Sequence, residues 1–397
     1  MRSSPPSPLD PPAAELSWLD RAEALAADFA DRAAELDESA ELPVDNLRRL
    51  HEAGFDTAWL PAEHGGEGLS WVTFGAVLTT VARACPSTAT IWLMHLGAAY
   101  GLVHMSDDAN ARFFAGELAR GKRFANALSE PTGGNLFLMP LQAARPVPDG
   151  FVLDGAKRFV SGCEAADYLL VNALVDGVPA FFGITPDATL KLVPIWDSMG
   201  LRATRSQLIT FDGTVLPADR RCTRRTDEPN PIPVGLPFLS IGVAEAALET
   251  LRAHARDRVI PTTGQPLAEM QWVRFAVAAE YVRLRAATLL AAQTAWLADQ
   301  RSPLTNPTSL EAKLLANEVA KDVAALGVKV GGGSGYLRTS PIQRHFRDAQ
   351  AGALMAYSVE VCQDEVGTAF LAGPAAATGS GEAAGPAAAG AKAATDA

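Results

Sequence analysis

The middle of the chain most constrains the fold, because between residues 124 and 220 it consists of short β-prone runs separated by turn signals. The turn signals are Pro148-Asp149-Gly150, Asp176-Gly177 and Asp212-Gly213. The runs are rich in branched and aromatic residues, and they are Phe151–Leu153, Phe159–Val160, Tyr168–Val171, Ala180–Ile184, Leu190–Val193 and Leu208–Phe211. Several strands at such short spacing predict a small β-sandwich or barrel.

Helical periodicity precedes this β region. Apolar residues recur at three- and four-residue spacing from Leu16, which predicts a first helix, and a second begins after Pro43. Ser70 follows a Gly-rich turn and is placed to cap a further helix. The Ala-rich stretch from Thr80 to Gly116 predicts nearly continuous helix. We therefore expect residues 15–122 to form an N-terminal α domain.

The helical period returns after the β region. Amphipathic helices are expected at 236–258, 270–297 and 310–330, the last of them ended by the glycine cluster at 331–336. A final helix is expected at about 341–371. The sequence thus predicts an α+β protein with a central β domain at 123–220 and a C-terminal helical bundle at 231–372. The Pro/Ser-rich residues 1–14 and the Ala/Gly-rich residues 373–397 are expected to be disordered tails.

Charge and composition exclude several classes of function. The chain of 397 residues has a formal net charge of −11, which disfavours nucleic acid or an anionic membrane as its main partner. We find no apolar run of the about 20 residues that a membrane span needs and no signal peptide, so the expected location is cytoplasmic. The cysteines are far apart and form no CxxC, which predicts free thiols without a disulfide or metal site; they are Cys85, Cys163, Cys222 and Cys362.

A candidate binding loop lies at Asn126–Asn135, where an apolar run stops at Ser129-Glu130-Pro131 and opens into Gly133-Gly134. Pro131 restricts the backbone, and the glycines can adopt positive φ, so backbone N–H groups could converge on an electron-rich ring or a phosphate. On turn chemistry alone, a plain surface turn between two strands is the favoured interpretation of this loop.

Five stretches in order resemble motifs of the acyl-CoA dehydrogenase superfamily. They are PAEHGGEG at 61–68, ALSEPTGG at 127–134, GAKRFVSGCEAADYLLV at 155–171, MGLRATRSQLITFDGTVLP at 199–217 and GGGSGYLRTSPIQRHFRDA at 331–349. The resemblance spans about residues 15–370. It implies a helical N-terminal domain, a central β domain and a C-terminal four-helix bundle, with FAD bound between the last two and partly against a neighbouring subunit.

The resemblance also implies site residues. Leu128 and Ser129 would donate to the flavin ring, Phe159 would replace the Trp that packs on it, and Ser161 would replace the Thr near flavin N5. Arg258 would reach the FAD diphosphate of a neighbouring subunit, and Gly332 and Gly333 would form the turn beside the adenine-side phosphate and ribose. Asn135 would lie near the substrate chain. For Gly200, Arg202, Arg347 and Asp348 we expect structural roles, Arg202 in an ion pair.

The match breaks at the catalytic base. In the family a Glu removes the α-proton of the thioester, but its usual position holds Ala356 here and its alternative position holds Ile232. Glu360 lies one turn beyond Ala356, where we expect a solvated helix face. Neither Ala356 nor Ile232 can move a proton.

Three functions therefore remain open. The first is an FAD-dependent dehydrogenase of an acyl-CoA or acyl-carrier thioester, working as a homodimer or homotetramer. The second is a flavin monooxygenase of the same fold, which needs no α-proton base and relies on a separate flavin reductase. The third is a base-less subunit that assembles with a catalytic paralogue. The fold alone cannot choose among them.

Overall fold

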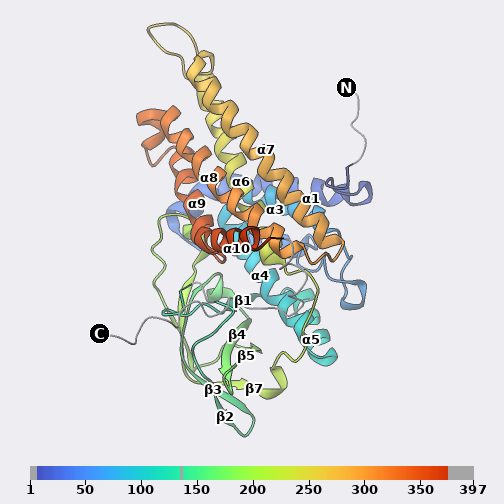
Figure 1. Cartoon of the computed structure of the whole chain (residues 1–397). Coiled ribbons are helices and arrows are strands. Elements are labelled where there is room, and N and C mark those ends of the chain that lie inside the picture. Colours follow the sequence, from blue (N-terminus) through green and yellow to red (C-terminus); the bar gives the residue numbers. More distant parts are fainter. Residues whose placement is uncertain (1–6, 135–136, 374–397) are drawn as a thin grey trace, which may run out of the picture.

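The computed structural model describes residues 7–134 and 137–373 (Figure 1). Residues 1–6 and 374–397 of the expected tails, and Asn135, lie outside the described residues. A 3₁₀ turn at Ala13–Glu15 leads into the first helices. These are α1 (Leu16–Ser39), α2 (Val44–Glu52), α3 (Trp71–Ala84), α4 (Pro86–Met105) and α5 (Asp108–Ala119).

Local capping chemistry sets these helix boundaries. The Ser70 side chain accepts a hydrogen bond from the backbone N–H of Thr73, so the expected cap of α3 is confirmed. The nearly continuous helix expected from Thr80 to Gly116 is confirmed, with two short breaks. It breaks at Cys85, because Pro86 at the start of α4 keeps the preceding residue extended, and again before Asp107, which caps α5.

Two sheets form the central β region. The three-stranded sheet has the order β1 (Phe124–Ala127), β4 (Tyr168–Val175) and β5 (Val178–Ile184), with β1 parallel to β4. The four-stranded antiparallel sheet has the order β2 (Arg145–Val147), β3 (Gly150–Val160), β7 (Gln207–Pro217) and β6 (Leu190–Val193). Side chains from both sheets, such as Leu153, Phe182 and Phe211, share one core, so the region is a β-sandwich.

Two details of the sandwich differ from expectation. The runs Phe151–Leu153 and Phe159–Val160 belong to one strand, β3, whose register shifts between them. Asp212-Gly213 is not a turn between strands but an irregularity within β7, where the Gly213 N–H donates to the Asp154 carboxylate at 2.7 Å. In both places a bulge absorbs the turn-like residues and the strand continues.

The C-terminal helices are α6 (Pro231–Asp257), α7 (Gln271–Asp299), α8 (Thr305–Tyr336), α9 (Pro341–Leu354) and α10 (Val359–Ala372). We expected the glycine cluster at 331–336 to end the preceding helix, but α8 continues through it to Tyr336. Helical structure resumes after a kink at Gly332, whose φ of 53° and ψ of −142° are open to glycine at little cost. The single helix expected at 341–371 is two, because residues 355–358 form an elbow between α9 and α10.

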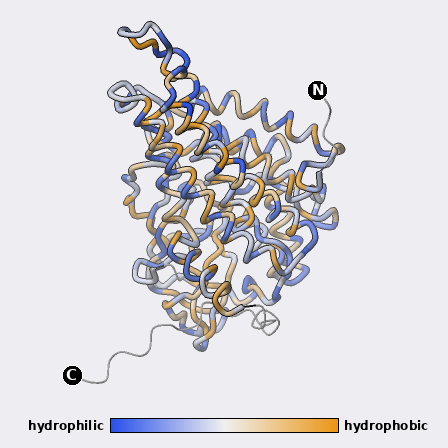
Figure 2. The backbone as a smooth tube through the Cα atoms, turned by 45° about the horizontal axis from the view of Figure 1, so that its top comes forward, coloured by the Kyte–Doolittle hydropathy of each residue, from blue (hydrophilic) through white to orange (hydrophobic). Residues whose placement is uncertain are grey.

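Helices from both ends of the chain share the main core. Buried side chains of α1, α3 and α4 belong to the same cluster as those of α6, α7 and α8. Hydrophobic and hydrophilic stretches follow one another along much of the backbone in Figure 2. The sandwich lies beside this helical body, at the lower end of the view in Figure 1. The observed order of helices, sheets and helices confirms the α+β fold class, whereas the domain boundaries stay a prediction.

One long apolar helix lies in the core of the protein. Contrary to the sequence expectation, α6 is long and apolar enough to cross a membrane, but 83% of its most apolar window is buried inside the structure. It packs against α3, α8 and α9. The four cysteines are free, as predicted.

Candidate functional site

A buried ion pair supports the loop after β1. Glu130 is 3% exposed and accepts hydrogen bonds from the backbone N–H groups of Leu141 and Gln142 at 3.0 and 3.1 Å. The Lys157 ammonium, fully buried on β3, donates to Glu130 at 2.8 Å and to the Asn172 side chain at 2.8 Å. Burial lowers the pKa of Lys157, and the neighbouring Glu130 carboxylate partly offsets this shift because it favours the charged ammonium. These contacts hold the Ser129-Glu130-Pro131 loop from its buried side, so the loop is not a free surface turn.

This anchoring brings the β-region site residues to one edge. The backbone N–H of Arg158 donates to the Ser129 carbonyl at 2.8 Å, so the end of β1 lies beside Phe159. Leu128 is buried beneath the loop, and Ser129 is half-buried. Ser161 lies two residues beyond Phe159 on the same segment, its hydroxyl 2.8 Å from that of Ser206. Four residues named from the sequence therefore converge.

Phe159 is the most unusual residue of this edge. Its φ is 58°, a left-handed conformation that is costly for an aromatic residue, and the residue is 52% exposed. The Arg158 guanidinium lies 4.7 Å from the ring centroid, and the Trp196 ring meets it edge-on at 6.3 Å. An exposed aromatic face between hydroxyl groups is suited to a flat heteroaromatic ligand such as a flavin ring.

The other predicted cofactor residues lie elsewhere. Arg258 is exposed and caps the C-terminus of α6. The C-terminal end of α6 points away from the sandwich (Figure 1). The kink at Gly332 and Gly333 belongs to the same end, because Val330 packs in one cluster with Ala255 of α6. The structure does not bring these three residues together with Ser129 and Phe159 within one chain. Asn135, the predicted substrate contact, lies outside the described residues.

Neither of the two positions at which the resemblance predicts a base holds a titratable side chain. The Ile232 side chain, at the start of α6, lies against Gly97 of α4. Ala356 is half-buried in the elbow between α9 and α10 and packs against the main core. Glu360 is exposed on the first turn of α10, which confirms the expected solvated position.

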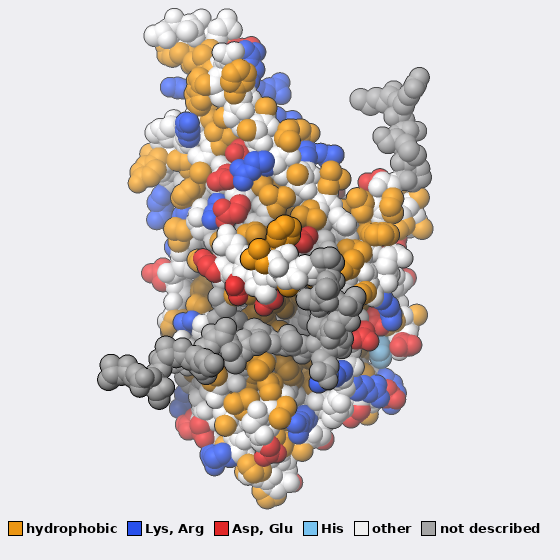
Figure 3. Space-filling view, viewed as in Figure 1, with side chains coloured by type: hydrophobic (Ala, Val, Ile, Leu, Met, Phe, Trp, Pro, Cys, Tyr) orange, Lys and Arg blue, Asp and Glu red, His pale blue; other side chains and the backbone are white. Residues whose placement is uncertain are grey.

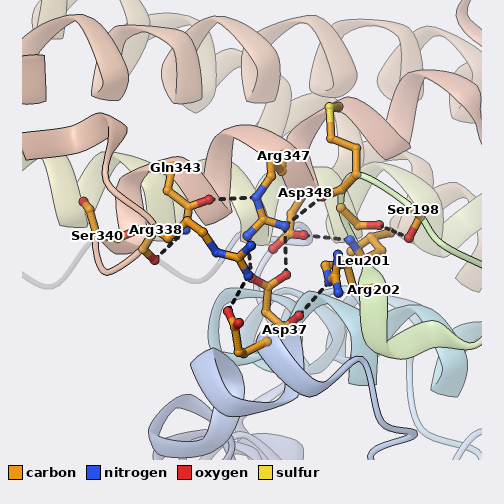
Figure 4. A network of polar contacts seen from close by, with 12 residues as sticks. Asp37, Ser198, Leu201, Arg202, Arg338, Ser340, Gln343, Arg347 and Asp348 are labelled. Atoms are coloured by element: carbon orange, nitrogen blue, oxygen red, sulfur yellow. Dashed lines mark hydrogen bonds and ion pairs between the residues drawn. The ribbon is translucent and has the colours of Figure 1, made fainter. Parts of the chain in front are cut away.

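The Arg-Asp motif of α9 is structural, as predicted (Figure 4). The Arg347 guanidinium forms an ion pair with the Asp37 carboxylate of α1 and donates to the Met199 carbonyl at 2.7 Å. Asp348 accepts from the backbone N–H of Leu201 at 2.8 Å, and burial raises the pKa of Asp348 to about 6. The ion pair expected for Arg202 is wrong. Arg202 instead donates to the Asp37 backbone carbonyl, because Arg347 already engages the carboxylate.

Sequence reasoning missed a buried polar cluster behind the elbow. Lys313 and Asn317 on α8 both donate to the Gly352 carbonyl, at 2.9 and 3.0 Å, near the end of α9. Lys313 is 2% exposed, and burial lowers the pKa of Lys313 to about 8. The Ser240 hydroxyl of α6 donates to Asn317 at 2.7 Å. Within a regular amphipathic helix pattern, nothing marks Lys313 as buried.

Tyr357 is a second missed residue. It follows Ala356 in the elbow with a φ of 58°, the left-handed region that an aromatic residue seldom enters. Its ring meets that of Phe137 edge-on, with centroids 5.1 Å apart. Burial raises the pKa of Tyr357 above its ordinary value.

Comparisons with known proteins agree with this arrangement. The acyl-CoA dehydrogenase N-terminal domain model matches residues 14–122, and the C-terminal domain model matches residues 235–367. The chain is 28% identical over 349 residues to the mitochondrial short-chain specific acyl-CoA dehydrogenase of Bos taurus, covering 81% of this chain and 82% of that protein.

Solved structures show the same fold. Butyryl-CoA dehydrogenase from Megasphaera elsdenii superposes with a TM-score of 0.84 at 22% identity, covering 94% of this chain and all of that one. FMN-bound TdsC from Paenibacillus sp. A11-2 superposes with a TM-score of 0.80 at 24% identity, covering 89% of this chain and 97% of that one. The chain belongs to the acyl-CoA dehydrogenase superfamily of flavin-dependent oxidoreductases.

Proposed function

We propose that this protein is an FAD-dependent oxidoreductase that dehydrogenates the α,β-bond of an acyl thioester. The convergence of Ser129, Phe159 and Ser161 at one edge of the sandwich is the observation that carries the proposal. A bound flavin supplies the acceptor for the hydride that leaves the β-carbon. The buried Glu130–Lys157 pair holds the Ser129 loop in place, and Phe159 offers the face on which the flavin ring packs.

The proposal that the cofactor is FAD and the proposal that the protein is a homo-oligomer rest on the same argument. Arg258 caps the C-terminus of α6, and this end of the helix points away from the sandwich (Figure 1), so within one chain its guanidinium could not reach a flavin on the sandwich. A second copy could bring Arg258 and the Gly332 turn to the diphosphate, which FAD has and FMN lacks. The exposed apolar side chains along α7, including Trp272, Phe275 and Val282, support such an assembly.

The surface supports the remaining expectations about partners. Figure 3 shows basic and acidic side chains interspersed over the visible face, and the net charge of the chain is −11. Such a surface does not favour nucleic acid or an anionic membrane, and it suits a cytoplasmic enzyme of small thioesters.

One observation favours a second candidate, a flavin monooxygenase of the same fold. Both base positions are apolar and packed, Ile232 against α4 and Ala356 against the main core, while Glu360 is exposed. A reaction in which O₂ meets reduced flavin needs no α-proton base, and a separate reductase would supply the electrons.

The deciding experiment is an anaerobic titration of the flavin-loaded protein with acyl-CoAs of graded length, following flavin absorbance at about 450 nm. Bleaching on mixing is expected for the dehydrogenase. If no thioester bleaches the flavin, but a substrate-dependent O₂ uptake appears once a flavin reductase is added, the monooxygenase is the correct assignment. Protein that never retains flavin, although made with excess FAD, would contradict both and leave the base-less subunit of a mixed assembly.

A further inference from the structure

Arg158 brings an unpaired positive charge to the edge of the sandwich that carries Phe159. It lies on β3 between the buried Lys157 and the exposed Phe159. The Cζ atom of its guanidinium is 4.7 Å from the centroid of the Phe159 ring. Its Nε is buried, and within residues 7–134 and 137–373 the guanidinium has neither a hydrogen-bond acceptor nor a carboxylate partner.

Other cations close to this edge are paired. The Lys157 ammonium donates to the Glu130 carboxylate at 2.8 Å, and Arg205 forms an ion pair with Glu164 at 2.8 Å. A guanidinium cannot escape its own charge by losing a proton in a protein. A partly buried charge is costly without a partner, so the unpaired guanidinium of Arg158 indicates a site for a negatively charged ligand group beside the Phe159 ring.

A flavin packed on Phe159 acquires such a charge during its reaction. The inference rests on the flavin of the proposed function, and it holds for either substrate class. A hydride carries two electrons and one proton, so an oxidised flavin ring that accepts a hydride gains one negative charge, which N1 and the C2 carbonyl share. A nearby cation stabilises this reduced ring more than the oxidised one.

We propose that Arg158 balances the charge of the reduced flavin and so raises the reduction potential of the bound cofactor. Packed aromatic rings have centroids about 4.5–7 Å apart, so a flavin ring on Phe159 lies within about 12 Å of the Arg158 guanidinium. At an effective dielectric constant of about 20, unit charges at this outer distance favour the reduced ring by a factor of about ten. A closer approach increases the factor.

Replacing Arg158 by Met tests the proposal, because methionine keeps an apolar stem on Phe159 and removes the charge. The potential of the bound flavin is measured in the full-length, flavin-loaded protein by anaerobic reductive titration with a reference dye. For Arg158→Met we expect the preference for reduced over oxidised flavin to fall about tenfold or more, which lowers the two-electron potential by about 30 mV or more. Arg158→Gln should shift it in the same direction and replaces the Met variant if that one does not fold.

Two further variants separate this charge from packing and from the general field of the protein. Arg158→Lys keeps a cation and should restore most of the wild-type potential. Arg145→Met removes the same charge from the same sheet, but Arg145 is 69% exposed and already pairs with Asp154. Solvent and salt screen such a charge, so Arg145→Met should change the preference less than about threefold.

The possible results distinguish this inference from the proposed function. An unchanged potential in Arg158→Met, with flavin retained, would overturn the role of Arg158. If the variant retains little flavin, titrations with oxidised and with dithionite-reduced FAD give the same preference as a ratio of two Kd values. Equal losses of affinity for both forms would also overturn the role, because they would indicate a contact with a group whose charge is constant, such as a phosphate. Wild-type protein that binds no flavin would contradict the proposed function itself.

Discussion

Lys313 allows a stability prediction whose size follows from its burial. The ammonium group is 2% exposed and its acceptor is the neutral Gly352 carbonyl, so burial lowers its pKa from 10.5 to about 8. Between these two pKa values the unfolded chain binds the proton and the native protein has released it, so the free energy of unfolding rises with pH. Each pH unit within this window contributes about 1.4 kcal/mol.

Lys313→Met removes this proton linkage while filling most of the same space. From pH 7.5 to 9.5 the free energy of unfolding of the wild type, minus that of the variant, should increase by about 2 kcal/mol. Urea denaturation followed by circular dichroism at both pH values measures this difference. Groups that titrate here without contacting Lys313 are present in both proteins, so their contributions cancel. Lys313 lowers the pKa of Cys362, so both proteins carry Cys362→Ala, which removes this coupled group.

Lys191→Met is the matched control, because the Lys191 side chain is 67% exposed and should show no such pH dependence. A difference between wild type and Lys313→Met that stays constant, or falls, from pH 7.5 to 9.5 would refute the reasoning. It would mean that Lys313 keeps its proton in the native state.

Three further predictions concern the supports of the site. Lys157→Met leaves the Glu130 carboxylate buried without its cation and should cost about 3–5 kcal/mol of stability, measured by urea denaturation; a loss below about 1 kcal/mol would show that the pair is not needed. Arg258→Ala should lower flavin content after gel filtration without changing the circular dichroism spectrum, whereas Arg256→Ala, exposed two residues away, should not; normal flavin content in Arg258→Ala would sink the residue assignment. Arg347→Ala removes a half-buried ion pair with Asp37 and should lower the free energy of unfolding by about 2 kcal/mol. Arg338→Ala removes a largely exposed pair with Glu38 and should lower it by less than about 1 kcal/mol. Equal losses of stability in thermal denaturation would contradict the role of burial.

Local signals predicted the fold well where they were unambiguous. Ser70 caps α3, and the Asp176-Gly177 turn joins β4 to β5, because both depend on chemistry within a few residues. The helix breaks before Pro86 and at Asp107 are also marked by local residues, namely the proline itself and the capping aspartate. The Ala-rich pattern of this stretch does not by itself reveal them.

Other features depended on contacts between distant parts of the chain. The helix continues past Gly332 because Ile342 of α9 packs on Gly331 and Gly335. The strand β7 continues through Gly213 because Asp154 of the neighbouring strand accepts its N–H. No pattern within one segment contains such information.

The residues of the candidate site also include some that sequence motifs identify and others that only contacts between distant segments explain. The sequence motifs identified Ser129, Phe159 and Ser161, and the structure places them at one edge; their contacts with the cofactor stay a prediction. Lys313 and Tyr357 could not be found from the sequence. Burial of a lysine and a left-handed tyrosine both arise from how α8, α9 and α10 pack around residues 355–358.

The elbow at residues 355–358 therefore carries the open question about this protein. The family resemblance predicts the base position at Ala356 in this elbow. The Lys313, Asn317 and Cys362 contacts hold the segment, and it retains a costly left-handed Tyr357. Backbone strain persists only where the surrounding structure stabilises it, and it concentrates at functional sites. The contacts of Lys313, Asn317 and Cys362 thus fix the shape of residues 355–358 whichever side chain stands at position 356.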